Sequence, residues 1–228
     1  MRIRLVALVL VVILAAFMVS AFSDRIVLHA LARSYKIDLD YAHLSRERGG
    51  MRFQDFSVFD TVRSIGLSSR EAVIGLHPVA LVLSPKNVKI PFTLRDVSFV
   101  RGSRARKGSL SSIEQLVLVP FESRWTYRTI QGEIVIAQGA IILNKIFADS
   151  DSIRINLKGT ISPNDLIDVE ADLSFSQTAL ADVPSELTFI LEDKSPEWKS
   201  ISFSLRGNLQ KPAIQLRSKS FGLRIGTE

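Results

Sequence analysis

The chain has 228 residues, enough for one large domain or two small ones, and its formal net charge of +6 comes from basic residues scattered along the sequence. Scattered charge argues against a nucleic-acid-binding protein, in which basic residues gather on one helix or face. The lack of cysteine excludes disulfide scaffolds, thiol catalysis, cysteine-based zinc sites and a lipidated cysteine.

The first predicted element is a membrane helix. Eighteen uncharged residues, 5–22 (LVALVLVVILAAFMVSAF), follow the basic start MRIR. A helix of that length spans about 27 Å, which just crosses the hydrocarbon core of a bilayer. A cleavable signal peptide ending near Ala21 is the alternative, but the apolar run exceeds the usual length of such a segment. We expect an uncleaved anchor with its N-terminus in the cytoplasm.

The anchor helix is expected to continue along the membrane surface through DRIVLHALARSYK. Ser23 or Asp24 can cap this continuation. Residues 1–35 would then form the anchor and its interfacial extension, and residues 36–228 a separate domain outside the cytoplasm.

From Lys36 onward the hydrophobic period changes from helical to alternating. Apolar runs bounded by turn residues recur at short intervals, and they predict eleven or twelve strands. Strands that follow one another without crossover helices favour an antiparallel meander. SIEQLVLVPF and SELTFILED are among the predicted strands, and short helices are expected only near residues 144–149 and 178–182.

Two stretches near the C-terminus repeat one phrase, SIRINLKGTISP at 152–163 and SISFSLRGNLQKP at 200–212. Glycine inside a strand permits a bulge or bend, so Gly159 and Gly207 predict two long curving strands, each ended by a proline, Pro163 or Pro212. The strand at 167–176 alternates most regularly. Together the three strands predict one apolar lining: Ile153, Ile155, Leu157, Val169, Leu173, Phe175, Ile201, Phe203 and Leu205.

Taken in order, these elements resemble the AsmA-like superfamily of bacterial envelope proteins. The resemblance rests on the N-terminal apolar helix, on KIDLDYAHLSRERGGMRFQDFSVFD with the EAVIGLHPVALVLSPKNVKIPFTLRDVSF that follows, and on FSLRGNLQKPAIQL at 203–216. The chain is also similar to the type II secretion protein N group and, less closely, to the LptC group of lipopolysaccharide-bridge proteins. Many AsmA-like members are several times longer, so a domain of this size would form one end of a transport path, or an adaptor.

The resemblance implies a mainly β fold: a single transmembrane α-helix followed by a curved, twisted antiparallel β-sheet, either a groove or an open sandwich. It also implies a single-pass protein of the inner (cytoplasmic) membrane with the bulk of the chain in the periplasm. The implied role is lipid transport or outer-membrane biogenesis, with membrane lipids and envelope proteins as partners.

Motifs for catalysis or cofactor binding do not occur. The sequence has no hydrolase elbow, Walker loop, dinucleotide loop or HExxH motif, so we expect neither an enzyme nor a cofactor. His43 and His77 stand far apart without flanking carboxylates, which argues against a metal site. The carboxylates of 168–172 alternate on one strand and could bind calcium, but a solvated sheet face explains them better.

A basic loop, RGSRARKGS at 101–109, is the one candidate polar contact. Its cations are expected to be solvated, with contact to an anionic headgroup or an acidic partner as the alternative: Arg101, Arg104, Arg106 and Lys107. Trp125 and Tyr127 are expected to pack in the core or at the sheet rim.

Two functions remain open on the sequence. In the first, a membrane-anchored sheet holds acyl chains on its apolar concave face, or supports a lipid-transport assembly. In the second, the apolar faces close into an ordinary core, and the domain is a docking module of a secretion or envelope machine that works through its edge strands.

Overall fold

The structure is a computed structural model, and it describes residues 25–30, 32–34, 36–62, 64–76, 87–101, 112–181, 183, 185–209, 211–217 and 222–225. Residues 25–30 and 32–34 are helical. The expected membrane helix at 5–22 lies outside the described residues. Among the described helices, none has the length and apolar character needed to cross a bilayer.

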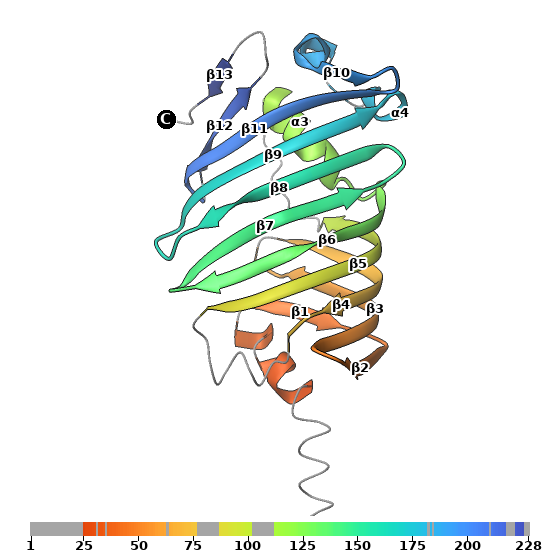
Figure 1. The fold of residues 1–228 in the computed structure, drawn as a ribbon, viewed down its shortest axis with the longest axis vertical. Coiled ribbons are helices and arrows are strands. Elements are labelled where there is room, and N and C mark those ends of the chain that lie inside the picture. Colours follow the sequence, from red (N-terminus) through yellow and green to blue (C-terminus); the bar gives the residue numbers. More distant parts are fainter. Residues whose placement is uncertain are drawn as a thin grey trace, which may run out of the picture.

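The described part contains thirteen strands, which join into one antiparallel sheet (Figure 1). They are β1 Ile37–Asp40, β2 His43–Glu47, β3 Gly50–Asp60, β4 Ile65–Ile74, β5 Val88–Arg101, β6 Thr126–Ala137, β7 Ala140–Asp149, β8 Ile153–Ile161, β9 Leu166–Ser176, β10 Glu192–Ser195, β11 Trp198–Asn208, β12 Lys211–Arg217 and β13 Gly222–Ile225. Strands β1 and β2 share one edge of β3, and β10 and β12 share one edge of β11. The remaining strands follow chain order, so the predicted meander is confirmed.

One face of the sheet, here called the inner face, carries a continuous apolar row across nine strands. Each residue of the row is the register partner of the next: Leu44, Phe53, Ala72, Leu94, Ile130, Ala148, Ile155, Leu173 and Ile201. Cross-strand neighbours on one face pack directly against each other, so this row ties the strands of the meander together. All of its members except Leu44 are buried.

Short helices cover the middle of the inner face. They are α3 Ser112–Leu118, η1 Val119–Phe121, α4 Gln177–Leu180 and η2 Ser185–Ile190, and Figure 1 shows α3 behind the sheet near β8 and β9. Ile113 and Leu116 of α3 belong to the same core cluster as Phe56 and Val97 of the sheet. The Tyr127 hydroxyl donates a buried hydrogen bond to the Pro120 carbonyl at 2.7 Å, which fixes η1 to β6.

A bend crosses β3 and β5 at Asp55 and Asp96, whose φ angles are +50° and +53°. Buried residues on either side of the bend are three apart, Phe53 and Phe56 on β3 and Leu94 and Val97 on β5. Side chains alternate strictly in a regular strand, so each bend reverses the alternation once and keeps the apolar residues on the inner face.

Three of the predicted elements differ from the structure. SIEQLVL forms α3 rather than a strand, because Ile113 and Leu116 are spaced to bury one face of a helix. Residues 144–149 belong to β7 rather than to a helix; a bulge at Lys145, with φ of +48°, interrupts their alternation. SELTFI forms η2 rather than a strand. The helix predicted near 178–182 is present as α4.

The two repeated phrases form β8 and β11, and both turn their apolar residues to the inner face, as predicted. Gly159 and Gly207 have φ angles of +154° and +101°. Pro163 lies in the turn after β8, but Pro212 is the second residue of β12 and pairs with Gly207, so it does not end the phrase before the next strand begins.

Candidate functional site

The nine residues predicted as an apolar lining all lie on the inner face. Seven of them are buried: Ile153, Ile155, Val169, Leu173, Phe175, Ile201 and Phe203. Only Leu157 and Leu205 are partly exposed. The sheet and its helices thus already pack most of this set, and contact of these nine residues with lipid stays a prediction.

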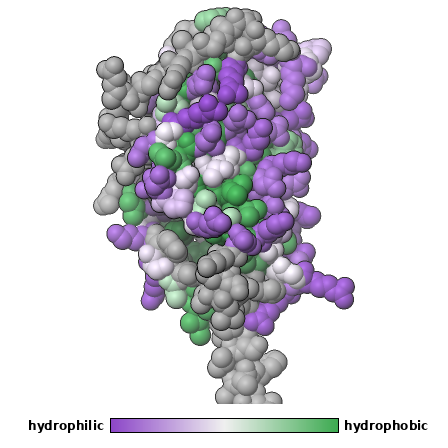
Figure 2. Space-filling model, turned by 60° about the vertical axis from the view of Figure 1, so that its left-hand side comes forward, coloured by the Kyte–Doolittle hydropathy of each residue, from purple (hydrophilic) through white to green (hydrophobic). Residues whose placement is uncertain are grey.

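The inner face continues beyond this core toward the β6–β7 and β8–β9 turns. Two further rows of register partners lie there, here called the open rows: Val88, Ile136, Ile141, Ile161 and Ile167 in one, and Ile90, Ile134, Leu143, Gly159, Val169 and Leu205 in the other. Apart from Ile167 and Val169 these residues are partly exposed. Figure 2, turned so that the side with these strand ends comes forward, shows hydrophobic residues in the middle of the face between hydrophilic margins.

The open rows carry only hydrocarbon side chains and one glycine, with no donor, acceptor or charge. Such a surface can bind a partner through burial of apolar area at about 25 cal/mol per Å2, but it cannot orient a polar ligand. The pattern suits an aliphatic chain. Residues of β6 and β7 were not among the predicted lining. The isoleucine runs on both sides of Gln138-Gly139 are the sequence signal for them.

A second apolar site, here called the tip pocket, lies at the far end of the same face. It has a volume of about 500 Å3 and is lined by Ile37, Val58, Asp60, Ile65, Gly66, Leu67, Phe99, Val100, Leu118 and Phe121. Asp60 is the one charged residue of this lining, and its Oδ1 accepts a hydrogen bond from the Val62 N–H at 2.8 Å. The tip pocket therefore offers an apolar ligand mainly hydrocarbon walls.

The opposite, outer face is polar, and its carboxylates are paired across the strands. Asp168 lies 3.0 Å from Arg206, and Glu170 lies 3.1 Å from Lys158 and 3.4 Å from Arg217. The hydrogen bond from Lys158 and its positive charge hold the pKa of Glu170 below its usual value. These pairs explain the alternating acidic residues of β9 as a solvated face.

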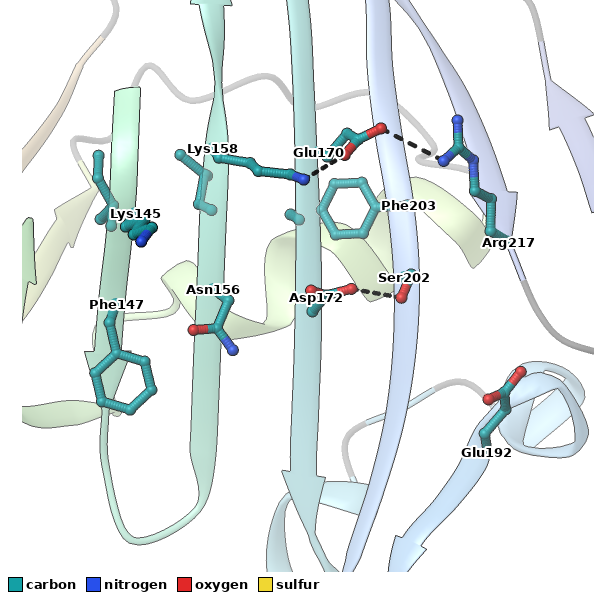
Figure 3. Close-up of a pocket in the computed structure, with 13 residues that line it drawn as sticks. Lys145, Phe147, Asn156, Lys158, Glu170, Asp172, Glu192, Ser202, Phe203 and Arg217 are labelled. Carbon is teal, nitrogen blue, oxygen red and sulfur yellow. Dashed lines mark hydrogen bonds and ion pairs between the residues drawn. The ribbon is translucent and has the colours of Figure 1, made fainter. Parts of the chain in front are cut away.

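A shallow pocket of about 750 Å3 lies over this polar face. Figure 3 shows Lys158 reaching toward Glu170 and Ser202 toward Asp172. In the described part of the chain, no group of three or more histidine, aspartate or glutamate residues is arranged to hold a metal ion.

The basic loop, two histidines and two aromatic residues were also singled out in the sequence. Arg101 ends β5, and nothing is described of its side chain; Arg104, Arg106 and Lys107 lie outside the described residues. His43 lies exposed on β2, and His77 is outside the described residues. Tyr127 is buried in the core, and Trp125 is half-buried beneath Arg124, whose guanidinium lies 4.8 Å from the indole centroid.

Comparisons of the chain with models of protein families, with curated proteins and with solved structures gave no match.

Proposed function

We propose that this chain is a membrane-anchored, non-catalytic protein of the bacterial envelope whose curved sheet binds lipid acyl chains on its inner face, in support of lipid transport or outer-envelope assembly. The observation that carries the proposal is the pair of open rows, which extend one apolar face beyond the part that the helices cover.

The inner face is divided between a covered core and the open rows. Among the described residues, the core cluster joins the middle of the face to α3 and η2, and it includes none of Val88, Ile90, Ile134, Ile136, Ile141, Leu143 and Ile161. Contiguous apolar side chains that remain partly exposed can form a binding surface. An acyl chain laid across the strands would cover these side chains without needing a polar partner.

The sequence gives a second reason to propose lipid binding. The apolar run at 5–22 is long enough to cross a bilayer and would hold the sheet beside a source of lipid. The chain also resembles the AsmA-like superfamily in its N-terminal apolar helix and its glycine-bearing C-terminal strands, and that resemblance implies the inner membrane and the periplasm as its location.

The test labels the full chain with a phospholipid that carries a photoreactive diazirine in its acyl chain. After reconstitution in liposomes and irradiation, we expect labelled peptides from β6, β7 and β8 as well as from residues 5–22. Leu143→Asp should remove most label from these strands, because a charge beside an acyl chain is costly to desolvate.

Ile142→Asp is the matched control for Leu143→Asp. Ile142 is the neighbouring residue of the same strand, is also partly exposed, and points to the outer face. Label confined to residues 5–22 in the unmodified chain would reject lipid binding by the sheet.

A docking function of the kind found in a secretion machine is the second candidate, as for a type II secretion protein N-like component or an LptC-like bridge module. It is favoured by the C-terminal edge of the sheet. There Lys211–Ala213 pair with β11 on one side, and in the described part of the chain β13 reaches only Ile214–Arg217 on the other. Backbone groups at such an edge can add a strand from a partner. Under this function a proline in place of Ala213 would abolish partner binding, and the open rows would take no acyl label.

A further inference from the structure

The inner face of β5 carries three zones in succession. Val88 and Ile90 belong to the open rows, Leu94 and Val97 lie in the core beside the bend, and Phe99 lines the tip pocket. The tip pocket is therefore a separate apolar site, with η1 and the end of α3 forming part of its wall through Phe121 and Leu118. Phe99 packs edge-on against Phe121, with 5.2 Å between ring centroids, which holds this wall in place.

Large apolar side chains are exposed at the rim of the tip pocket and in the β3–β4 turn beside it. Val62, in the β3–β4 turn, is 65% exposed; Ile65 at the start of β4 is 48% exposed, and Val100 near the end of β5 is 43% exposed. Single exposed apolar residues are common, but here Ile65 and Val100 also line one apolar pocket. A volume of about 500 Å3 falls within the range of about 300–1,000 Å3 that ligand sites occupy.

Hydrogen bonds tie this rim to the segment that follows the apolar run. The Thr61 N–H and hydroxyl both donate to the Lys36 carbonyl, at 3.2 and 2.8 Å. Ile37, the next residue, is part of the pocket lining and the register partner of Asp60. The rim of the pocket therefore cannot move away from residue 36 without breaking these contacts.

The length of chain between the apolar run and the pocket limits how far the pocket can lie from the membrane. Fourteen residues separate Phe22 from Ile37, and residues 25–30 and 32–34 among them are helical. The nine helical residues cover about 14 Å, and the other five can cover at most about 18 Å. If residues 5–22 span a bilayer, as in the proposed function, the tip pocket lies within about 32 Å of the membrane surface, roughly the length of a single transmembrane helix.

We propose that the tip pocket holds an acyl chain of a membrane phospholipid, with the β3–β4 turn and the end of β5 lying against the membrane surface. The hydrocarbon walls, the exposed rim and the short tether to the apolar run all fit a lipid tail that leaves the bilayer. This inference rests on the membrane anchor of the proposed function, but it does not depend on lipid binding by the open rows.

The test uses the lack of cysteine in the chain, which allows single-cysteine labelling. Full-length Ile65→Cys, labelled with bimane, is reconstituted in liposomes of phosphatidylethanolamine and phosphatidylglycerol that carry doxyl groups on their acyl chains. Leu166→Cys is the matched control, because Leu166 is 47% exposed but lies at the β8–β9 turn. Val62→Cys repeats the measurement at a more exposed position, in case labelling at Ile65 disturbs β4.

We expect doxyl lipid to quench bimane at Ile65 and Val62 at least about twofold more than at Leu166, because side chains inserted about 5–10 Å into the interface lie beside the acyl chains. Equal quenching at all three positions would overturn the proposal. A second contrary result is a loss of bimane fluorescence that grows with the protein-to-lipid ratio and also occurs in liposomes without doxyl lipid. That result would mean that the pocket binds a second copy of this chain. Failure of the chain to float with liposomes would also overturn the proposal, since the anchor would then be wrong.

Bimane at Leu143→Cys reports on the open rows in the same liposomes. Quenching at Ile65 without quenching at Leu143 would support the tip pocket while rejecting lipid binding by the open rows. The reverse result would retain the proposed function and reject the tip pocket.

Discussion

Gly159 of β8 lies opposite Val169 of β9, and a Cβ added to Gly159 would meet the Val169 Cα at 2.5 Å. The backbone of β9 thus occupies the space that a side chain at position 159 would need. Gly207, which holds the equivalent place in the second repeated phrase, has no heavy atom within 4 Å of such a Cβ. The two glycines therefore have different structural roles, although they occupy the same position in the repeated phrase.

Gly159→Ala should destabilise the domain more than Gly207→Ala. Both glycines have positive φ angles that L-residues rarely adopt, at a cost of about 1–3 kcal/mol each. Overlap with β9 should add about 1–3 kcal/mol at Gly159 only. Urea unfolding of the full chain in detergent measures the difference, and equal losses for the two variants would show that β8 and β9 are not so close.

Tyr127→Phe should loosen η1 from the sheet. The substitution removes the hydrogen bond to the Pro120 carbonyl and leaves that buried acceptor unpaired, a loss of about 1–3 kcal/mol. Tyr41→Phe is the control, because Tyr41 is only partly buried. Similar unfolding midpoints for the two variants would contradict the role given to the Tyr127 hydroxyl.

Phe203→Ala and Leu143→Ala should separate the residues that hold the fold from those that offer a binding surface. Phe203 is 5% exposed in the core cluster, so its truncation should cost about 3–5 kcal/mol. Leu143 is partly exposed and lies outside that cluster, so its truncation should cost less than half as much. A large loss at Leu143 would mean that this residue is part of a closed core.

Glu170→Gln should change stability in a pH-dependent way. The folded-state pKa of Glu170 lies below its usual value of 4.5, because Lys158 bonds and attracts the carboxylate. The ion pairs should therefore stabilise the fold above about pH 4.5, and this contribution should vanish as pH falls through the lowered pKa. Since the pair is exposed, the loss in the variant should be at most about 1 kcal/mol and should shrink with salt.

Glu133→Gln is the control for this pH effect, because the Glu133 carboxylate accepts a hydrogen bond from the neutral Asn144 amide. Unfolding midpoints between pH 3 and 8 for both variants and the unmodified chain give the comparison. A difference between Glu170→Gln and the unmodified chain that persists at the lowest pH would contradict the ion-pair explanation.

Local pattern was sufficient to predict the sheet. Alternation along β8, β9 and β11 placed Ile155, Leu173 and Ile201 on one face, and the register joins these three residues directly. The alternation of side chains between the two faces of a strand depends only on backbone geometry, so it holds in any tertiary arrangement. Strand order followed from the absence of long crossovers.

Tertiary packing determines the secondary structure of the elements that hydrophobic alternation did not predict. The sequence of α3 is a short apolar run, which periodicity cannot distinguish from a strand. In the fold its Ile113 and Leu116 join the same core cluster as Val97 and Tyr127. The bends at Asp55 and Asp96 place buried residues three apart within one strand, a spacing that strict alternation does not allow.

The apolar character of the candidate site was predicted from the sequence, but most of its exposed residues were not. An apolar lining was expected, but which residues stay uncovered depends on where α3, η1 and η2 lie, and that is fixed by contacts distant in sequence. The tip pocket joins Ile37, Ile65, Phe99 and Phe121, which come from four different elements. No single stretch of sequence signals such a pocket.

The most direct measurement places a photoreactive benzoylphenylalanine at Leu143 or at Ile142 of the full chain in its native envelope. Both positions are partly exposed neighbours on β7, and they point to opposite faces of the sheet. Mass spectrometry after irradiation identifies what each residue contacts. Phospholipid adducts at Leu143 and none at Ile142 are the result that an acyl-binding inner face predicts; no lipid adduct at either position, or equal amounts at both, would contradict it.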